Sequence, residues 1–140
     1  MKKIVLIGRS ESGKTTLTQA LRGAARHYHK TQYVNHFDVV IDTPGEYAQT
    51  ANLGAALALY TYEADVVGLL MAATETYSLF PPAVAAVSNR DTIGIITKID
   101  EPGANVEQAR RWLNLAGCER IFLVDSLKMD GVQEILDYLK

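Results

Sequence analysis

The sequence predicts a three-layer α/β fold, in which a mostly parallel sheet carries helices on both faces. Short β-branched runs alternate with segments of helical periodicity along the 140 residues. The composition, 48% hydrophobic and 21% charged, is enough to fill one compact core. The sequence contains no repeat, low-complexity tract or long linker, so we expect one domain over residues 1–140.

The expected strands are short runs rich in β-branched residues. They cover Lys3–Ile7, Phe37–Ile41, Asp65–Met71, Thr92–Thr97 and Arg120–Val124. The longest apolar stretch, Ala64–Ala73, falls well short of the roughly 20 residues that span a bilayer. We therefore interpret it as a buried strand.

Helical periodicity predicts the segments between the strands. Helices are expected over Lys14–Gly23, Thr50–Tyr62, Asn105–Ala116 and Asp130–Leu139, with a weaker one near Pro82–Ser88. In the last strong segment, Asp130 and Gln133 resemble a capping box three residues apart. We expect this helix to begin at Asp130 and to close the sheet.

Charge and cysteine content limit the partners and the compartment. With 14 Lys plus Arg against 16 Asp plus Glu, the net charge of -2 favours neither nucleic acid nor a membrane as a partner. The one cysteine, Cys118, cannot form an internal disulfide, and we interpret it as a small core residue. The charged start Met1-Lys2-Lys3 runs directly into a strand, so we expect a cytoplasmic protein.

A phosphate-loop pattern, G-x-x-x-x-G-K-[ST], spans Gly8 to Thr15 between an expected strand and an expected helix. Its backbone N–H groups can point at phosphates, Lys14 can reach the terminal phosphates as a catalytic group, and the Thr15 hydroxyl can ligate Mg²⁺. We expect the Glu11 side chain to point to solvent, because a carboxylate turned inward would repel phosphate. The nucleotide-binding residues expected here are Gly8, Ser10, Glu11, Ser12, Gly13, Lys14, Thr15 and Thr16.

A D-x-x-G motif, Asp42-Thr43-Pro44-Gly45, ends the second expected strand. The Asp42 carboxylate can hold Mg²⁺ through water, and the backbone N–H of Gly45 can meet a γ-phosphate. The motif therefore predicts a sensor of the nucleotide's state.

Two further motifs follow later strands and suit a base. In Thr97-Lys98-Ile99-Asp100, the Asp100 carboxylate can accept hydrogen bonds from N1 and N2 of guanine, which adenine cannot supply in that geometry. The Lys98 stem can lie along the base plane. After the last strand, a backbone N–H of Ser126 or Leu127 could reach guanine O6.

With these motifs in order, the chain resembles a Ras-like P-loop small GTPase domain over nearly its whole length. Within that superfamily it resembles the EutP/PduV group through "GRSESGKTTLTQAL", "KTQYV" and "IDTPGEY". Members of that group are encoded with bacterial microcompartments for ethanolamine or propanediol utilisation. The resemblance implies GTP or GDP and Mg²⁺ as cofactors, guanine contacts from Lys98 and Asp100, and Thr31 as the switch threonine that coordinates Mg²⁺ in the triphosphate state.

The chain departs from the superfamily pattern at three places. Only 28 positions separate Lys14 from Asp42, fewer than is usual in Ras-like domains. The strand that precedes Phe37–Ile41 in the superfamily, which is its second strand, must therefore be shortened to about Thr31–Val34. Thr97 stands where Asn is commoner, and we expect the loss of an amide that ties the phosphate loop to the base loop. Glu46 stands where a Gln would position the attacking water, so this catalytic candidate predicts slow hydrolysis.

Two classes of function stay open. The first is a GTP-binding, weakly hydrolysing switch whose output is contact with a protein partner, either an activator or a microcompartment shell component. The second is an ATP-dependent, acetate kinase-like phosphotransferase acting on a small carboxylate. The phosphate loop serves both; Asp100 favours guanine, whereas the missing Gln at position 46 favours the transferase. We therefore expect a cytoplasmic protein that is either free or associated with a microcompartment.

Overall fold

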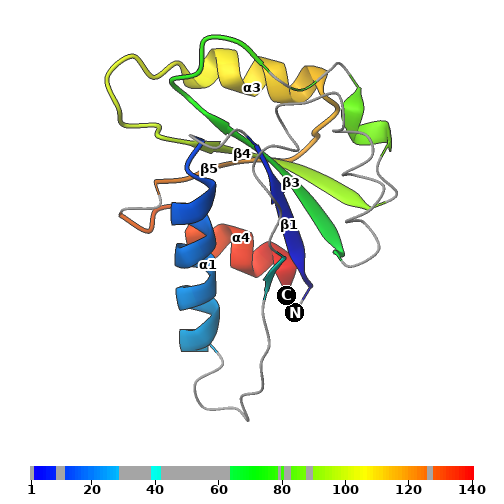
Figure 1. Ribbon diagram of the computed structural model, residues 1–140, viewed down its shortest axis with the longest axis vertical. Coiled ribbons are helices and arrows are strands. Elements are labelled where there is room, and N and C mark those ends of the chain that lie inside the picture. Colours follow the sequence, from blue (N-terminus) through cyan, green and yellow to red (C-terminus); the bar gives the residue numbers. More distant parts are fainter. Residues whose placement is uncertain are drawn as a thin grey trace.

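The computed structural model describes residues 2–8, 12–28, 39–41, 64–78, 80, 83–87, 90–125 and 128–140. Within these residues, five strands form one sheet in the order β2-β1-β3-β4-β5 (Figure 1). Every neighbouring pair of strands is parallel. The strands are β1 (Ile4–Ile7), β2 (Val40–Ile41), β3 (Val66–Ala72), β4 (Asp91–Thr97) and β5 (Ile121–Leu123).

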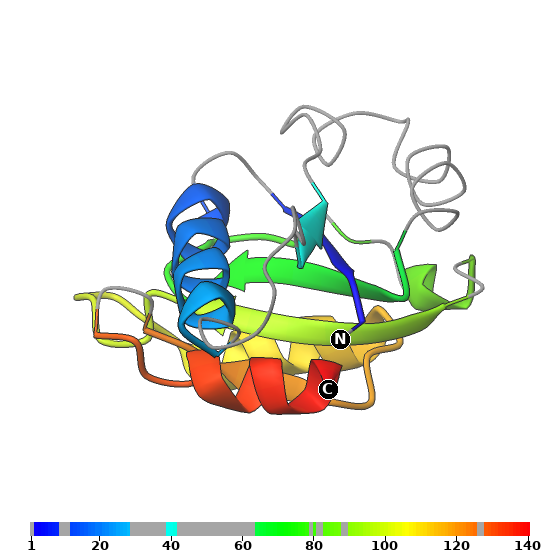
Figure 2. The ribbon, with the colours of Figure 1, turned by 90° about the horizontal axis from the view of Figure 1, so that it is seen from below.

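Helices cover both faces of the sheet. The helices α1 (Lys14–Tyr28) and α4 (Val132–Leu139) pack together on one face, and α3 (Val106–Leu115) covers the other (Figures 1 and 2). A short 3₁₀ helix, η2 (Val84–Val87), precedes β4. The predicted three-layer α/β architecture is confirmed.

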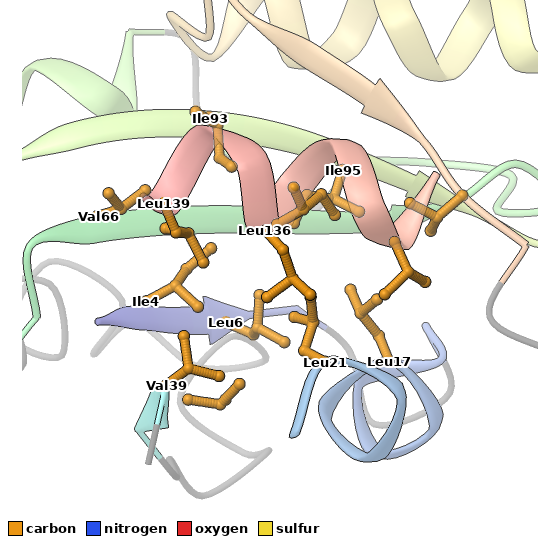
Figure 3. Close-up of a cluster of buried hydrophobic side chains, with 14 of the residues drawn as sticks. Ile4, Leu6, Leu17, Leu21, Val39, Val66, Ile93, Ile95, Leu136 and Leu139 are labelled. Carbon is orange, nitrogen blue, oxygen red and sulfur yellow. The ribbon is translucent and has the colours of Figure 1, made fainter. Parts of the chain in front are cut away.

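Alternation along the strands divides the core into two halves. Ile4 and Leu6 of β1 pack toward α1 and α4, where Leu17 contributes to the same cluster (Figure 3). Val5 and Ile7 point to the opposite face, which α3 covers. Successive side chains of a strand point to opposite faces, so both faces of these strands must be apolar when helices cover both.

The observed bounds follow the predicted runs with a few differences. α1 continues to Tyr28, beyond the predicted end at Gly23, and Ala25 extends its buried face. Within the predicted helix Pro82–Ser88, of which the structure describes residues 83–87, the observed element is the four-residue η2. In the run Phe37–Ile41, the strand is Val40–Ile41, and Val39 precedes it. The predicted helix Thr50–Tyr62 and the shortened strand Thr31–Val34 lie outside the described residues.

The predicted capping box at the start of α4 is wrong. The helix begins at Val132, and its N-cap is Gly131 with φ of 80° and no side-chain cap. Asp130 instead exchanges two backbone hydrogen bonds with Asp125, at 2.9 and 3.0 Å. A Cβ at Gly131 would collide with the carbonyl oxygen of Leu123, so only glycine fits between this turn and the helix.

No helix in the described part of the chain combines the length and the apolar character that crossing a membrane requires. The two ends of the chain lie close together (Figure 1). The backbone N–H of Lys2 donates to the carbonyl of Leu139 at 2.7 Å.

Candidate nucleotide-binding site

The carboxyl ends of the parallel strands meet at one edge of the sheet. Gly8 follows β1, Lys98 follows β4, and Asp125 comes soon after β5. In open α/β sheets, ligands bind at this edge, near the point where the strand order reverses. Here the order reverses at β1, which lies between β2 and β3. The predicted phosphate and base motifs therefore converge on the place where the fold favours a ligand.

The phosphate loop begins in direct contact with β3. A Cβ at Gly8 would lie 2.6 Å from the carbonyl oxygen of Leu70 and 2.9 Å from Oγ of Ser12, and Ser12 is fully buried. Room, rather than an unusual φ, is what requires glycine at position 8. Gly8, at the start of the motif, is thus packed closely against β3 and lies next to Ser12, which comes just before α1.

Gly13 makes the turn into α1. Its φ is +91°, a conformation that favours glycine, and its carbonyl accepts the first helical hydrogen bond from Leu17 at 2.9 Å. Lys14, Thr15 and Thr16 then occupy the first turn, which contains no acidic residue. N–H groups in a first turn have no carbonyl partner within their own helix, and the helix dipole is positive there. This geometry suits an anion such as a phosphate.

A cavity of about 200 Å³ lies beside this first turn, between α1 and β2. The guanidinium of Arg22 donates to the carbonyl of Val40 at 3.1 Å and joins the two elements. Mg²⁺ in nucleotide sites binds one or two protein oxygens together with phosphates and waters, and Thr15 supplies a hydroxyl at the cavity wall. The donor chemistry here fits Mg²⁺. The cavity is lined by Leu6, Lys14, Thr15, Thr18, Gln19, Arg22 and Ile41.

Thr97 connects the base motif to the phosphate loop. Its side chain is buried, and its hydroxyl donates a short hydrogen bond to the backbone carbonyl of Ser12. The amide is missing, as expected, but the Thr97 hydroxyl takes its place and still joins the two loops. Gly13 lies beside this contact, since a Cβ built there would lie 3.4 Å from the Thr97 hydroxyl oxygen, an ordinary contact distance.

A second cavity, of about 300 Å³, lies between the base motif and the start of α1. Lys98 enters it with φ of +57°, a conformation that non-glycine residues adopt at a cost. Such strain at a cavity is typical of functional positions. The cavity is lined by Gly13, Thr16, Thr97, Lys98, Asp100, Glu101, Asp125 and Lys128.

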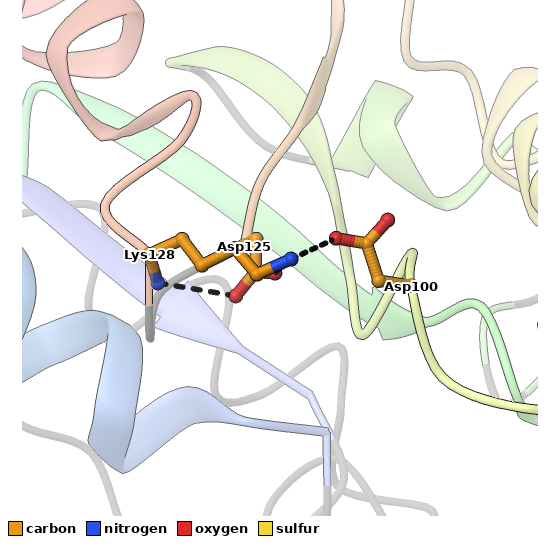
Figure 4. Close-up of polar contacts among 3 residues, drawn as sticks. All are labelled: Asp100, Asp125 and Lys128. Atoms are coloured by element: carbon orange, nitrogen blue, oxygen red, sulfur yellow. Dashed lines mark hydrogen bonds and ion pairs between the residues drawn. The ribbon is translucent and has the colours of Figure 1, made fainter.

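Asp100 points its exposed carboxylate at Lys128 in this cavity (Figure 4). The Lys128 ammonium lies 3.2 Å from Oδ2 of Asp100, and this hydrogen bond is the largest cause that lowers the pKa of Asp100 below its ordinary value. The same contact raises the pKa of Lys128. At neutral pH, Asp100 is thus an ionised acceptor, as base recognition requires. Lys128 was not predicted from the sequence, although its place directly after the Ser126-Leu127 motif was the available signal.

The structure brings nine of the predicted residues to this edge of the sheet, around the two cavities or the loop between them. They are Gly8, Ser12, Gly13, Lys14, Thr15, Thr16, Thr97, Lys98 and Asp100. The remaining predicted residues lie outside the described part of the chain. They are Ser10, Glu11, Thr31, Asp42, Gly45, Glu46, Ser126 and Leu127.

Solved structures with the same fold include a G-domain and a translation elongation factor. The FeoB G-domain from Methanococcus jannaschii superposes with a TM-score of 0.64 at 20% identity, covering 98% of this chain and 94% of that one. Translation elongation factor SelB from Methanococcus maripaludis, in its apo form, gives a TM-score of 0.61 at 19% identity, over 98% of this chain and 32% of that one. At these sequence identities, the similarity shows that this chain and the two solved proteins have the same α/β fold.

Relatives with higher sequence identity align with almost the whole chain. Propanediol utilization protein PduV of Citrobacter freundii is 40% identical over 140 residues, covering 99% of this chain and 93% of that protein. A Salmonella typhimurium protein named "Probable acetate kinase EutP" is 36% identical over 144 residues, covering 99% of this chain and 89% of that one. All 140 residues match the family described as "Ethanolamine utilisation - propanediol utilisation". The chain therefore belongs to the PduV-EutP family.

Proposed function

We propose that this chain binds GTP and GDP with Mg²⁺ and acts as a switch in ethanolamine or propanediol utilisation. The observation that carries the proposal is the link between two cavities at one edge of the sheet. The phosphate loop lines one cavity, the Asp100 carboxylate lies in the other, and the buried Thr97 hydroxyl joins the two loops. A nucleotide needs this pairing of an anion site with a nearby base site.

Each described residue has a role that matches its position. Lys14 contacts the terminal phosphates and Thr15 supplies a hydroxyl to Mg²⁺, since both line the cavity beside the first turn of α1. Asp100 accepts from N1 and N2 of guanine, and the Lys98 stem lies along the base. When bound, Mg²⁺ supplies charge neutralisation at the β- and γ-phosphates.

The state-sensing residues belong to the same proposal. Asp42 holds Mg²⁺ through water, Thr31 coordinates it in the triphosphate state, and Gly45 meets the γ-phosphate through its backbone N–H. Ser126 or Leu127 donates a backbone N–H to guanine O6. The match of the whole chain to the family, which includes these segments, is consistent with one nucleotide-binding domain.

Hydrolysis is proposed to be slow. A Gln at position 46 would accept from the attacking water and donate toward the phosphate, whereas an ionised Glu46 only accepts and carries a charge near the γ-phosphate. Glu46→Gln should therefore raise the rate of single-turnover GTP hydrolysis. A rate equal to or below that of the wild type would contradict this and would favour Glu46 as a base.

The output is proposed to be contact with a protein, either an activator or a shell component of a bacterial microcompartment in the cytoplasm. The family description supports the metabolic context. Pull-down of purified shell proteins by the chain loaded with GTP or with GDP tests it. Binding that is the same in both states would contradict a switch.

Lys14→Ala tests the site itself. Removing a charged phosphate donor should weaken GDP binding by roughly tenfold or more, while the thermal midpoint of the free protein stays unchanged because no core volume is lost. Unchanged GDP affinity would overturn the phosphate site.

An acetate kinase-like activity is the alternative, since a relative bears that name. In that reaction an acetate oxygen attacks the γ-phosphorus of ATP, the bond to the β-phosphate oxygen breaks, and acetyl phosphate and ADP form. Acetate-dependent release of ADP, absent without acetate and lost in Lys14→Ala, would replace the switch with this enzyme.

A further inference from the structure

The ammonium of Lys128 lies in the cavity assigned to the base (Figure 4). Its Nζ is 3.2 Å from Oδ2 of Asp100 and 3.9 Å from Oδ2 of Asp125. The backbone N–H of Lys128 also donates to Oδ1 of Asp125 at 3.3 Å. Asp125 therefore holds the backbone from which the lysine side chain extends to Asp100.

The turn that carries Lys128 is closed by its own backbone. Asp125 and Asp130 exchange two hydrogen bonds, and Met129 takes a φ of +62° within the turn. These features keep Lys128 beside the base cavity independently of the partner that its ammonium has. Asp100 and Lys128 both line this cavity, so a base that enters it can contact both side chains.

The pair of side chains presents a different edge to a base than Asp100 alone. An ionised carboxylate only accepts hydrogen bonds, and an ammonium only donates them. Asp100 alone offers two acceptors, which match the N1–H and N2–H donors of guanine. Asp100 with Lys128 at Oδ2 offers an acceptor beside a donor, which matches the N6–H donor and the N1 acceptor of adenine.

We propose that Lys128 is a specificity-determining residue that lowers this site's preference for guanine over adenine. Guanine must displace the ammonium from Oδ2 of Asp100, whereas adenine can accept from it. The inference rests on the proposed nucleotide-binding function and adds to that function a residue that sets base selectivity.

The size of the effect follows from the exposure of the pair. The Lys128 and Asp100 side chains are 66% and 56% exposed, and ion pairs in such surroundings are weak and screened by salt. Displacing the ammonium should therefore lower guanine affinity by only about two- to fivefold. The wild type should still prefer guanine, but with a smaller ratio of ADP to GDP dissociation constants than Asp100 alone would give.

The test is calorimetric titration of the wild type, Lys128→Met and Lys140→Met with GDP and with ADP in Mg²⁺. Met keeps an unbranched stem and removes the charge. Lys140 is the matched control, because it pairs with exposed Asp137 at 3.1 Å at the end of α4, away from the base cavity. The ratio of the ADP dissociation constant to that of GDP should rise about threefold or more in Lys128→Met and stay unchanged in Lys140→Met.

A second readout needs no nucleotide. In Lys128→Met, the pKa of the Asp100 carboxyl, followed by NMR, should rise toward its ordinary value, because its largest lowering cause is removed. An unmoved pKa, an unchanged ratio of dissociation constants, or weaker GDP binding with ADP binding unchanged would each overturn the inference and leave the proposed function standing. Failure of the wild type to bind either nucleotide would instead overturn the proposed function, and the inference with it.

Discussion

The buried hydroxyl of Thr97 donates a hydrogen bond to the backbone carbonyl of Ser12, across 85 positions of sequence. This contact joins the end of β4 to the loop that precedes α1. One side chain therefore holds the proposed base site next to the proposed phosphate site.

Thr97→Val keeps the shape of the side chain and removes the donor. The carbonyl of Ser12 then loses its partner in a buried position, which should lower the free energy of unfolding by about 1–3 kcal/mol and weaken GDP binding. Urea unfolding and GDP titration measure the two effects. Thr97→Ser should recover most of both, because it restores the hydroxyl; if Val performs as well as Ser, the hydroxyl does not hold the loop.

Lys98→Gly should be more stable than Lys98→Ala by about 1 kcal/mol, because alanine keeps the strain of a φ of +57° and glycine relieves it. Both variants lose the lysine stem and should bind GDP more weakly than the wild type. Thermal unfolding compares the two variants. Equal stabilities would mean that the backbone at this position stores no strain.

Gly8→Ala should destabilise the protein by about 1–3 kcal/mol, since a Cβ would lie 2.6 Å from the carbonyl oxygen of Leu70 and force the phosphate loop off β3. Gly23→Ala is the matched control within α1. Nothing lies within 4 Å of a Cβ there, and alanine should add roughly 0.5–1 kcal/mol through helix propensity. Denaturant midpoints of the two variants should therefore move in opposite directions; a shift in the same direction would contradict the close packing of the loop.

Burial raises the pKa of the Cys118 thiol to about 11 from an ordinary 9.0. A raised folded-state pKa gives stability that is complete below the unfolded pKa and is lost as the pH rises through the folded one. Stability should therefore fall between about pH 9 and 11 more steeply in the wild type than in Cys118→Ala. Unfolding free energies across this range check the slope; parallel curves would show that the thiol ionises equally in both states.

Much of the fold could be predicted from local sequence patterns. Val5 and Leu6 face opposite helical layers because successive side chains of a strand alternate between its two faces. The spacing of the phosphate-loop motif likewise places Gly8 and Lys14 at the two ends of one loop. Both features depend on neighbours in sequence. The bounds of β1, β3, β4 and β5 therefore lie within one residue of the predicted bounds, whereas β2 begins at Val40 instead of Phe37. Gly8 and Lys14 lie at the predicted edge of the sheet.

Contacts between distant segments were harder to predict. The sequence predicted only that an amide is missing at position 97; it did not predict that the Thr97 hydroxyl bonds to Ser12, because only the folded sheet shows how near Ser12 lies. The capping box at Asp130 failed because its backbone pairs with Asp125, an alternative that local pattern does not reveal. Lys128 was missed for the same reason, since its partner Asp100 lies 28 positions away.

Base preference tests most directly whether this edge of the sheet selects a guanine nucleotide. Calorimetric titration with GDP, GTP, ADP and ATP in Mg²⁺ should give tighter binding for the guanine pair. In Asp100→Asn, the ratio of the ADP dissociation constant to that of GDP should fall by roughly 10- to 100-fold, because a charged acceptor of two hydrogen bonds is lost. Adenine nucleotides that bind the wild type as tightly as guanine nucleotides would contradict the account.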